Sequence, residues 1–282
     1  MTPQEKRPCL RYQYPVPLVL RVGCSVLLGA RRSFAADAAR LYRTIAPSPR
    51  VEGLEQVPPE GGLVVVFNHY HSPSFASWWN AVAITTAIAS VRPLAAREST
   101  WLMTGAWTYP DRLRQRLITP LTERAFARIA QVYGFVAMPP MPPRPHEVEA
   151  RARAVRRALA IACRPQPRLI GISPEGRDSP DASLIEPPHG AGRFLLLLAA
   201  SLPILPAGVF EEGPQLTVRF GPPFTLQAPA GLGADERDAW ASERVMLAIA
   251  EQLPPRLWGA YHDRRAARRQ AGGSQQTNTP PS

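Results

Sequence analysis

The chain has 282 residues, of which 33 are basic and 22 acidic, giving a net charge of +11, and 45% of its residues are hydrophobic. That length can bury a substantial core, and one domain with extensions at its ends is the simplest organisation. The three cysteines, Cys9, Cys24 and Cys163, form no Cys-x-x-Cys pair. This spacing argues against a disulfide framework and a structural zinc site, and it favours a reducing compartment.

The positive charge is concentrated at the two ends of the chain. Residues 1–50 carry a net charge of +7 and residues 256–282 carry +4, whereas residues 51–255 are neutral. Acidic lipid or nucleic acid would attract such ends, although a solubilising tail explains the second end equally well. Because no nucleic-acid recognition motif accompanies the charge, we expect an anionic membrane surface as partner and no nucleic acid.

Two short helices are predicted near the amino terminus. Val16 to Gly29 is apolar except for Arg21 and Ser25, and a second helical pattern runs from Phe34 to Ile45 with arginines beside its apolar face. A helix over the first stretch spans about 21 Å, which is too short to cross a membrane. Residues 1–47 are therefore expected to form an amphipathic membrane-surface segment. The alternative is a helical pair that packs on the protein's own core.

The next predicted element is a buried strand that ends in polar residues. Leu63 to Phe67 is an unbroken apolar run, as in a strand covered on both faces, and Asn68-His69 follows it directly. Open α/β sheets usually bind ligands at the carboxyl ends of their strands. Histidine can accept a proton near neutral pH, so His69 is a candidate general base. A structural histidine is the alternative.

The middle of the chain reads as alternating helices and strands. We expect a buried helix over residues 80–91, a strand over residues 92–96, and a strand over residues 134–138. Between the last two lies the long segment from Trp101 to Tyr133, rich in arginine and apolar residues. It is interpreted as a cover over an acyl site or a second membrane contact, with a surface helical hairpin as the alternative.

A second strand-and-turn unit follows at Arg168 to Ile172, and it leads into Ser173-Pro174-Glu175-Gly176-Arg177. The remaining elements are a helix near residues 194–200, strands over 202–209 and 216–220, and a helix over 235–253 that ends at Pro254-Pro255. The basic tail of residues 256–282 is expected to be disordered.

The order Asn68-His69, then Pro174-Glu175-Gly176, then Leu202-Pro-Ile-Leu-Pro206 resembles the glycerolipid (lysophospholipid and 1-acylglycerol-3-phosphate) acyltransferases over about residues 50–225. In that family a His and an Asp five positions later form the catalytic motif. Here Ser74 stands at the position of that Asp. Arg177 replaces the family's usual Thr, and Met138 lies near the place of a further Arg.

The resemblance implies that His69 takes the proton from an acceptor hydroxyl that attacks an acyl thioester. A base of this kind needs a partner at its other ring nitrogen. Ser74 can orient the ring but cannot neutralise it. A backbone carbonyl, Glu98 or Asp178 could take the place of the motif Asp, and the sequence does not decide among them. His71 is a possible second base.

The predicted substrate-binding residues are Asn68, Pro174, Glu175, Gly176 and Arg177. Glu175 and Arg177 are expected to face the acceptor, and the turn from Pro174 to Arg177 is a source of backbone N–H donors for an oxyanion. Arg177 can bind a phosphate bidentately. For Glu175 the alternative is a solvated turn residue, and for Arg177 it is an ion pair with Asp178 or Asp181.

Together these patterns predict an α/β domain over residues 48–255, with a mixed central sheet flanked by helices and preceded by the helical pair. The resemblance implies a peripheral or monotopic acyltransferase on the cytoplasmic side of the cell membrane. Its substrates would be a lysolipid-like hydroxyl and an acyl thioester, either acyl-CoA or acyl carrier protein, with no cofactor and no metal. The alternative, supported by the absent Asp, is a weak or inactive relative that binds lipid or acyl groups.

Overall fold

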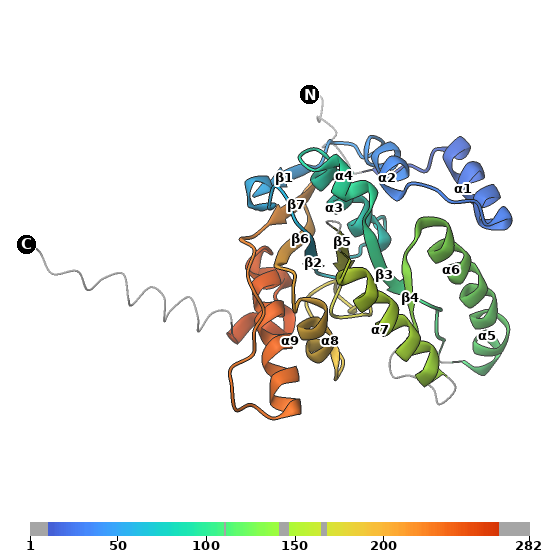
Figure 1. Cartoon of the computed structure of the whole chain (residues 1–282). Helices are drawn as coiled ribbons and strands as arrows, with labels where there is room; N and C mark the ends of the chain where they lie inside the picture. Colours follow the sequence, from blue (N-terminus) through green and yellow to red (C-terminus); the bar gives the residue numbers. More distant parts are fainter. Residues whose placement is uncertain (1–10, 110, 141–146, 165–167, 265–282) are drawn as a thin grey trace, which may run out of the picture.

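The computed structural model describes residues 11–109, 111–140, 147–164 and 168–264, and they form a mixed seven-stranded sheet between helices (Figure 1). The strand order is β1-β7-β6-β2-β5-β3-β4, in which only β6 and β7 pair antiparallel. The predicted fold class is confirmed. The strands are β1 (Arg50–Glu52), β2 (Leu63–Phe67), β3 (Thr100–Thr104), β4 (Val136–Met138), β5 (Leu169–Ile172), β6 (Ile204–Glu212) and β7 (Gln215–Phe220).

Helices cover both faces of the sheet (Figure 1). Helices α7, α8 and α9 pack in sequence on one face, whereas α2 packs on α3 and α1 packs on α6 on the other. The helices are α1 (Val16–Leu28), α2 (Phe34–Tyr42), α3 (Trp78–Ala89), α4 (Pro93–Arg97), α5 (Arg112–Leu117), α6 (Thr119–Tyr133), α7 (Val148–Ala162), α8 (Ala191–Leu198) and α9 (Ala234–Ala250), with 3-10 turns at Leu54–Gln56, Pro255–Leu257 and Gly259–Tyr261.

The two central strands carry the core. Every residue of β2 and of β5 is buried, as expected of strands with helices on both faces. Trp101 of β3 lies directly opposite Gly171 of β5, and a side-chain carbon at Gly171 would collide with the indole ring. Glycine at this position therefore lets a large aromatic side chain fill the space between the sheet and its covering helices.

The strand predicted at residues 92–96 is wrong. Pro93 to Arg97 form the short helix α4, with Pro93 in the first turn, where proline's fixed φ suits a helix. The strand of this unit is β3, which begins at Thr100. The apolar residues Trp101–Met103 therefore do not begin a helix. They belong to β3, which lies between β5 and β4 in the sheet.

The C-terminal end of the described chain packs more closely on the domain than the sequence indicates. Beyond Pro255, where the domain was expected to end, Leu257, Trp258 and Tyr261 are buried in the core cluster. The amide of Leu184 donates to the carbonyl of Leu257, which fixes this extension. The expected disordered tail from residue 265 onward lies outside the described residues.

Candidate functional site

The site lies where β2 and β5 end side by side. These strands are parallel neighbours, with Val66 opposite Ile172. The polar turns that follow them therefore emerge at the same edge of the sheet. The sequence predicts this meeting of Asn68-His69 with the Pro-Glu-Gly turn, and the structure brings the two together.

His69 is paired with a carboxylate from the second turn. Its ring nitrogen Nδ1 lies 2.8 Å from Oδ1 of Asp178, and the His69 side chain is three-quarters buried while that of Asp178 is more exposed. The hydrogen bond to His69 is the largest of the causes that lower the pKa of Asp178, so this carboxyl is ionised at neutral pH. An ionised carboxylate only accepts hydrogen bonds, so Nδ1 carries the proton and Nε2 of a neutral ring is left as an acceptor.

The predicted pairing of Ser74 with His69 is not what the structure shows. Ser74 lies in a tight turn closed by two hydrogen bonds between the backbones of Ser72 and Phe75, and its hydroxyl lies 3.4 Å from that of Ser72. The Nδ1 position that the serine was expected to serve is taken by Asp178. Asp178 is one of the three alternatives that the sequence leaves open.

Glu175 is turned into the protein, whereas the sequence predicts that it faces the acceptor. It is 2% exposed, and its two carboxylate oxygens accept the backbone N–H groups of His69 at 2.6 Å and Ile185 at 3.0 Å. Burial is the largest influence on this group and raises the pKa of Glu175 to about 7, although the two N–H donors act in the opposite direction. Glu175 thus holds the backbone of His69 in place.

Asn68 also has a structural position. Its side chain is 1% exposed, donates to the carbonyl of Val209 and accepts the amide of the same residue, both at 2.8 Å. Val209 belongs to β6, the neighbour of β2 on the side opposite β5. The side-chain amide of Asn68 completes the backbone hydrogen bonding of the sheet beyond the end of β2, whereas the sequence predicts that it contacts substrate.

The other members of the predicted turn divide between the interior and the surface. Pro174 is buried, whereas Gly176 and Arg177 are exposed. Gly176 has a φ of 63°, in the left-handed region that glycine adopts without strain. The turn at this residue directs the following chain so that Asp178 meets His69. Among the described residues Arg177 makes no ion pair with Asp178 or Asp181, so its guanidinium is open to solvent.

His71 adds a third link between the two turns. Its Nε2 lies 2.7 Å from the carbonyl oxygen of Ser179. A carbonyl only accepts hydrogen bonds, so this nitrogen carries a proton and cannot act as a base. With the bonds of Glu175 and Asp178 to His69, this contact fixes one turn against the other.

Aromatic residues that the sequence interpretation missed pack against the segment that follows His69. Tyr12, in the segment before α1, packs edge-on against Phe75 at 5.1 Å and donates a hydrogen bond to Glu211 at 2.7 Å. The indole N–H of Trp79 donates to the hydroxyl of Tyr14 at 3.0 Å. The signal available in the sequence was the alternation of Tyr12 and Tyr14 in an otherwise polar segment. The chain before α1 is thus fastened to the loop that carries His69.

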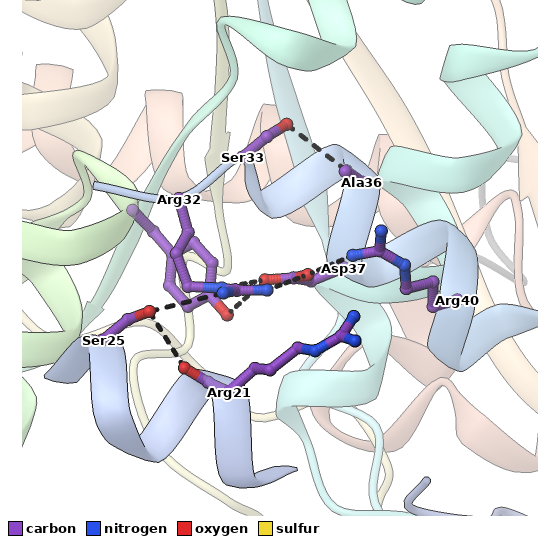
Figure 2. Close-up of polar contacts among 8 residues, drawn as sticks. Arg21, Ser25, Arg32, Ser33, Ala36, Asp37 and Arg40 are labelled. Atoms are coloured by element: carbon purple, nitrogen blue, oxygen red, sulfur yellow. Dashed lines mark hydrogen bonds and ion pairs between the residues drawn. The ribbon is translucent and has the colours of Figure 1, made fainter. Parts of the chain in front are cut away.

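The two N-terminal helices differ in their surroundings. Helix α2 is buried at Ala35, Asp37 and Ala38, as the alternative of packing on the core predicts. Asp37 accepts from Arg32 and Arg40 (Figure 2). Tyr133 of α6 also donates to Asp37, at 3.0 Å. Helix α1, by contrast, buries only Leu18 and Ser25. Only α2 is therefore part of the domain's core.

The described part of the chain contains no helix long and apolar enough to cross a membrane. Within the same residues, no cluster of three His, Cys, Asp or Glu side chains is arranged to hold a metal ion.

No family model and no curated protein matches the chain. A solved structure, that of the 1-acyl-sn-glycerophosphate (LPA) acyltransferase PlsC from Thermotoga maritima, is similar with a TM-score of 0.45 and 15% sequence identity, covering 83% of this chain and 87% of that chain. A likeness of this size does not establish what this chain does, so a functional assignment depends on the site itself.

Proposed function

We propose that the protein is an acyltransferase that moves a fatty acyl group from an acyl thioester to the hydroxyl of a lysolipid or a glycerophosphate-like acceptor. The observation that carries the proposal is the 2.8 Å contact between Nδ1 of His69 and Asp178. It supplies the carboxylate that the motif lacks at Ser74. It also weakens the case for an inactive relative, because that case depended on the missing acid.

In the proposed reaction Nε2 of His69 takes the proton of the acceptor hydroxyl while the hydroxyl oxygen attacks the thioester carbonyl carbon. Asp178 stabilises the imidazolium that forms. The tetrahedral oxyanion then collapses, the carbon–sulfur bond breaks, and the leaving thiolate takes the proton from Nε2. The products are an ester and a free thiol, which is coenzyme A or the thiol of a carrier protein.

The exposed turn after β5 suits the charged parts of such substrates. Backbone N–H groups between Pro174 and Arg177 are the proposed donors to the oxyanion. Arg177 is exposed and makes no ion pair among the described residues. Its planar guanidinium would bind an acceptor phosphate bidentately.

We further propose that α1 attaches the protein to the membrane surface from the cytoplasmic side, as a peripheral or monotopic protein. Its exposed apolar residues are Val16, Val19, Leu20, Leu27 and Leu28. Helices α5 and α6, which follow α1 down the same side of the molecule (Figure 1), add exposed Leu113, Leu117 and Leu121. The described cysteines, Cys24 and Cys163, are free thiols.

The test is turnover of a labelled acyl thioester by the purified full-length protein with a lysophospholipid acceptor. Wild type should form the ester, and His69→Ala should abolish its formation with stability changed by no more than about 1 kcal/mol. His71→Ala is the matched control and should retain most activity, because its ring only fixes the turn. Equal activity in His69→Ala and wild type would exclude the mechanism, and absence of turnover with retained lipid binding would favour the inactive relative.

A further inference from the structure

A concave site lies at the edge of the sheet away from His69. It is a cleft of about 420 Å³ between α6 and α7 beside the edge strand β4. Three strand spacings separate β2 from β4, which places the cleft about 14 Å along the sheet from the strand that carries His69. The cleft therefore belongs to a separate region of the surface.

The polar lining of the cleft is cationic. Among the described residues, Arg31, Arg153, Arg157 and Gln131 line it together with short apolar residues such as Ala127, and no acidic residue does so. Arg153 is paired along the helix with Glu149. Within the described part of the chain, Arg31 and Arg157 have no ion pair. Two guanidinium groups are thus left for an anion.

The backbone next to Arg31 is held in position by its neighbours. The amide of Arg32 donates to the carbonyl of Val132 at 3.0 Å, and the side chain of Arg32 is fixed between Ser25 and Asp37 (Figure 2). The guanidinium of Arg31 lies beside Gly134, 3.4 Å from the place where a side-chain carbon would stand. The linker between α1 and α2 is therefore fastened to the end of α6, which places the exposed Arg31 beside the cleft.

An apolar surface adjoins this cationic cleft. Leu27 and Leu28 at the end of α1 are each 82% exposed. The next residue, Gly29, lies beside the side chains of Arg128 and Gln131 of α6, and Gln131 lines the cleft. A ligand that fits both surfaces carries an anionic group and an apolar chain.

We propose that this cleft binds the phosphate headgroup of an anionic lipid, with the acyl chains directed along the exposed leucines of α1. Guanidinium groups bind phosphate through two parallel hydrogen bonds, and Arg31 and Arg157 are the groups available to do so. The inference goes beyond acyl transfer and does not depend on it, because binding here involves neither His69 nor turnover.

The experiment is calorimetric titration of the full-length protein with a short-chain, water-soluble phosphatidic acid, beside short-chain phosphatidylcholine and inorganic phosphate. These probes need no bilayer, so the result is independent of membrane insertion by α1. We expect phosphatidic acid to bind at least about tenfold more tightly than either of the other probes, which corresponds to about 1.4 kcal/mol. Equal affinity for inorganic phosphate would overturn the assignment to a lipid.

Charge reversal on α7 provides a matched pair. Arg157→Glu should weaken phosphatidic acid binding about tenfold or more, whereas Arg156→Glu, an exposed neighbour that does not line the cleft, should change it less than about twofold. Ala127→Phe, which fills the cleft without altering charge, should also weaken binding. Equal losses in the two Arg variants, with no loss in Ala127→Phe, would reduce the site to diffuse attraction and overturn the proposal.

Discussion

The backbone N–H of His69 donates to the buried carboxylate of Glu175 at 2.6 Å, while the ring of the same histidine meets Asp178 at 2.8 Å. Two acids of one turn thus hold one histidine, the first by its backbone and the second by its side chain. The two acids have different surroundings, because Glu175 is buried and Asp178 is partly exposed. Their loss should therefore have different consequences.

Removing the charge of Glu175 should lower stability. In Glu175→Gln a single amide oxygen replaces two acceptors, so either the N–H of His69 or that of Ile185 loses its partner. An unsatisfied buried donor costs about 1–3 kcal/mol, and urea unfolding of both proteins measures this loss. Glu186→Gln, at an exposed acid nearby, is the control and should be close to neutral.

The same variant tests the pKa of Glu175, which burial raises to about 7. Between the ordinary pKa of glutamic acid and that value the folded protein binds more protons than the unfolded chain, so this group's contribution to stability falls as pH rises. The stability of wild type relative to Glu175→Gln should then be greater at about pH 5 than at about pH 8, by at most about 3 kcal/mol. A difference that does not change with pH would show that Glu175 remains ionised throughout.

Asp178→Asn should reduce acyl transfer by about 100-fold or more with little change in folding. An amide cannot stabilise the imidazolium and can favour the wrong ring tautomer. The pKa of Asp178 is lowered by its bond to His69. The ionised carboxylate therefore stabilises the folded protein above the ordinary pKa of an aspartate, and this stabilisation is lost in more acidic solution. The measurement is the rate of ester formation against pH, with Asp181→Asn as control. Unchanged turnover would remove Asp178 from the mechanism.

Ser74→Asp should not raise the activity of the wild type. Although it restores the family pattern on paper, Nδ1 of His69 already has an acidic partner and Ser74 is held in the turn between Ser72 and Phe75. In the Asp178→Asn background the same change should recover part of the lost rate if the turn can move toward the ring. A large gain from Ser74→Asp alone would mean that Asp178 does not serve His69 during turnover.

The sequence predicted those features of the site that depend on burial and strand direction. It did not predict those that depend on the conformation of a turn. Apolar runs ending in His69 and before Pro174 were enough to predict neighbouring strand ends. Glu98 stayed among the possible partners of His69 because the strand was predicted to end just before it. With β3 beginning at Thr100, Glu98 lies at the opposite edge of the sheet, where it pairs with Arg168 at 3.5 Å.

The roles of Asn68 and Glu175 could not be read from the sequence for a different reason. A polar residue after a buried strand can contact a ligand or satisfy backbone groups, and both uses give the same sequence pattern. Only the folded chain shows that these two side chains bond to the backbones of Val209 and of His69 and Ile185. The partner of His69 likewise depends on the left-handed turn at Gly176, which brings Asp178 back over the ring.

The final prediction concerns attachment to the membrane. Removing the whole N-terminal segment would also remove Tyr14, which bonds to Trp79, and Ala38, which is fully buried. The sharper variant is therefore Leu20→Glu with Leu27→Glu on the exposed side of α1. It should release the protein from anionic liposomes in flotation, because a charge placed in the apolar stripe opposes insertion.

Leu94→Glu is the matched control, because Leu94 is 74% exposed but lies on α4. It should float as wild type does. High salt should release wild type only in part, since each basic residue near the surface contributes about 1 kcal/mol that salt screens, whereas apolar insertion persists. If the α1 variant floats as well as the control, the attachment lies in the exposed leucines of α5 and α6, and Leu117→Glu should then release the protein.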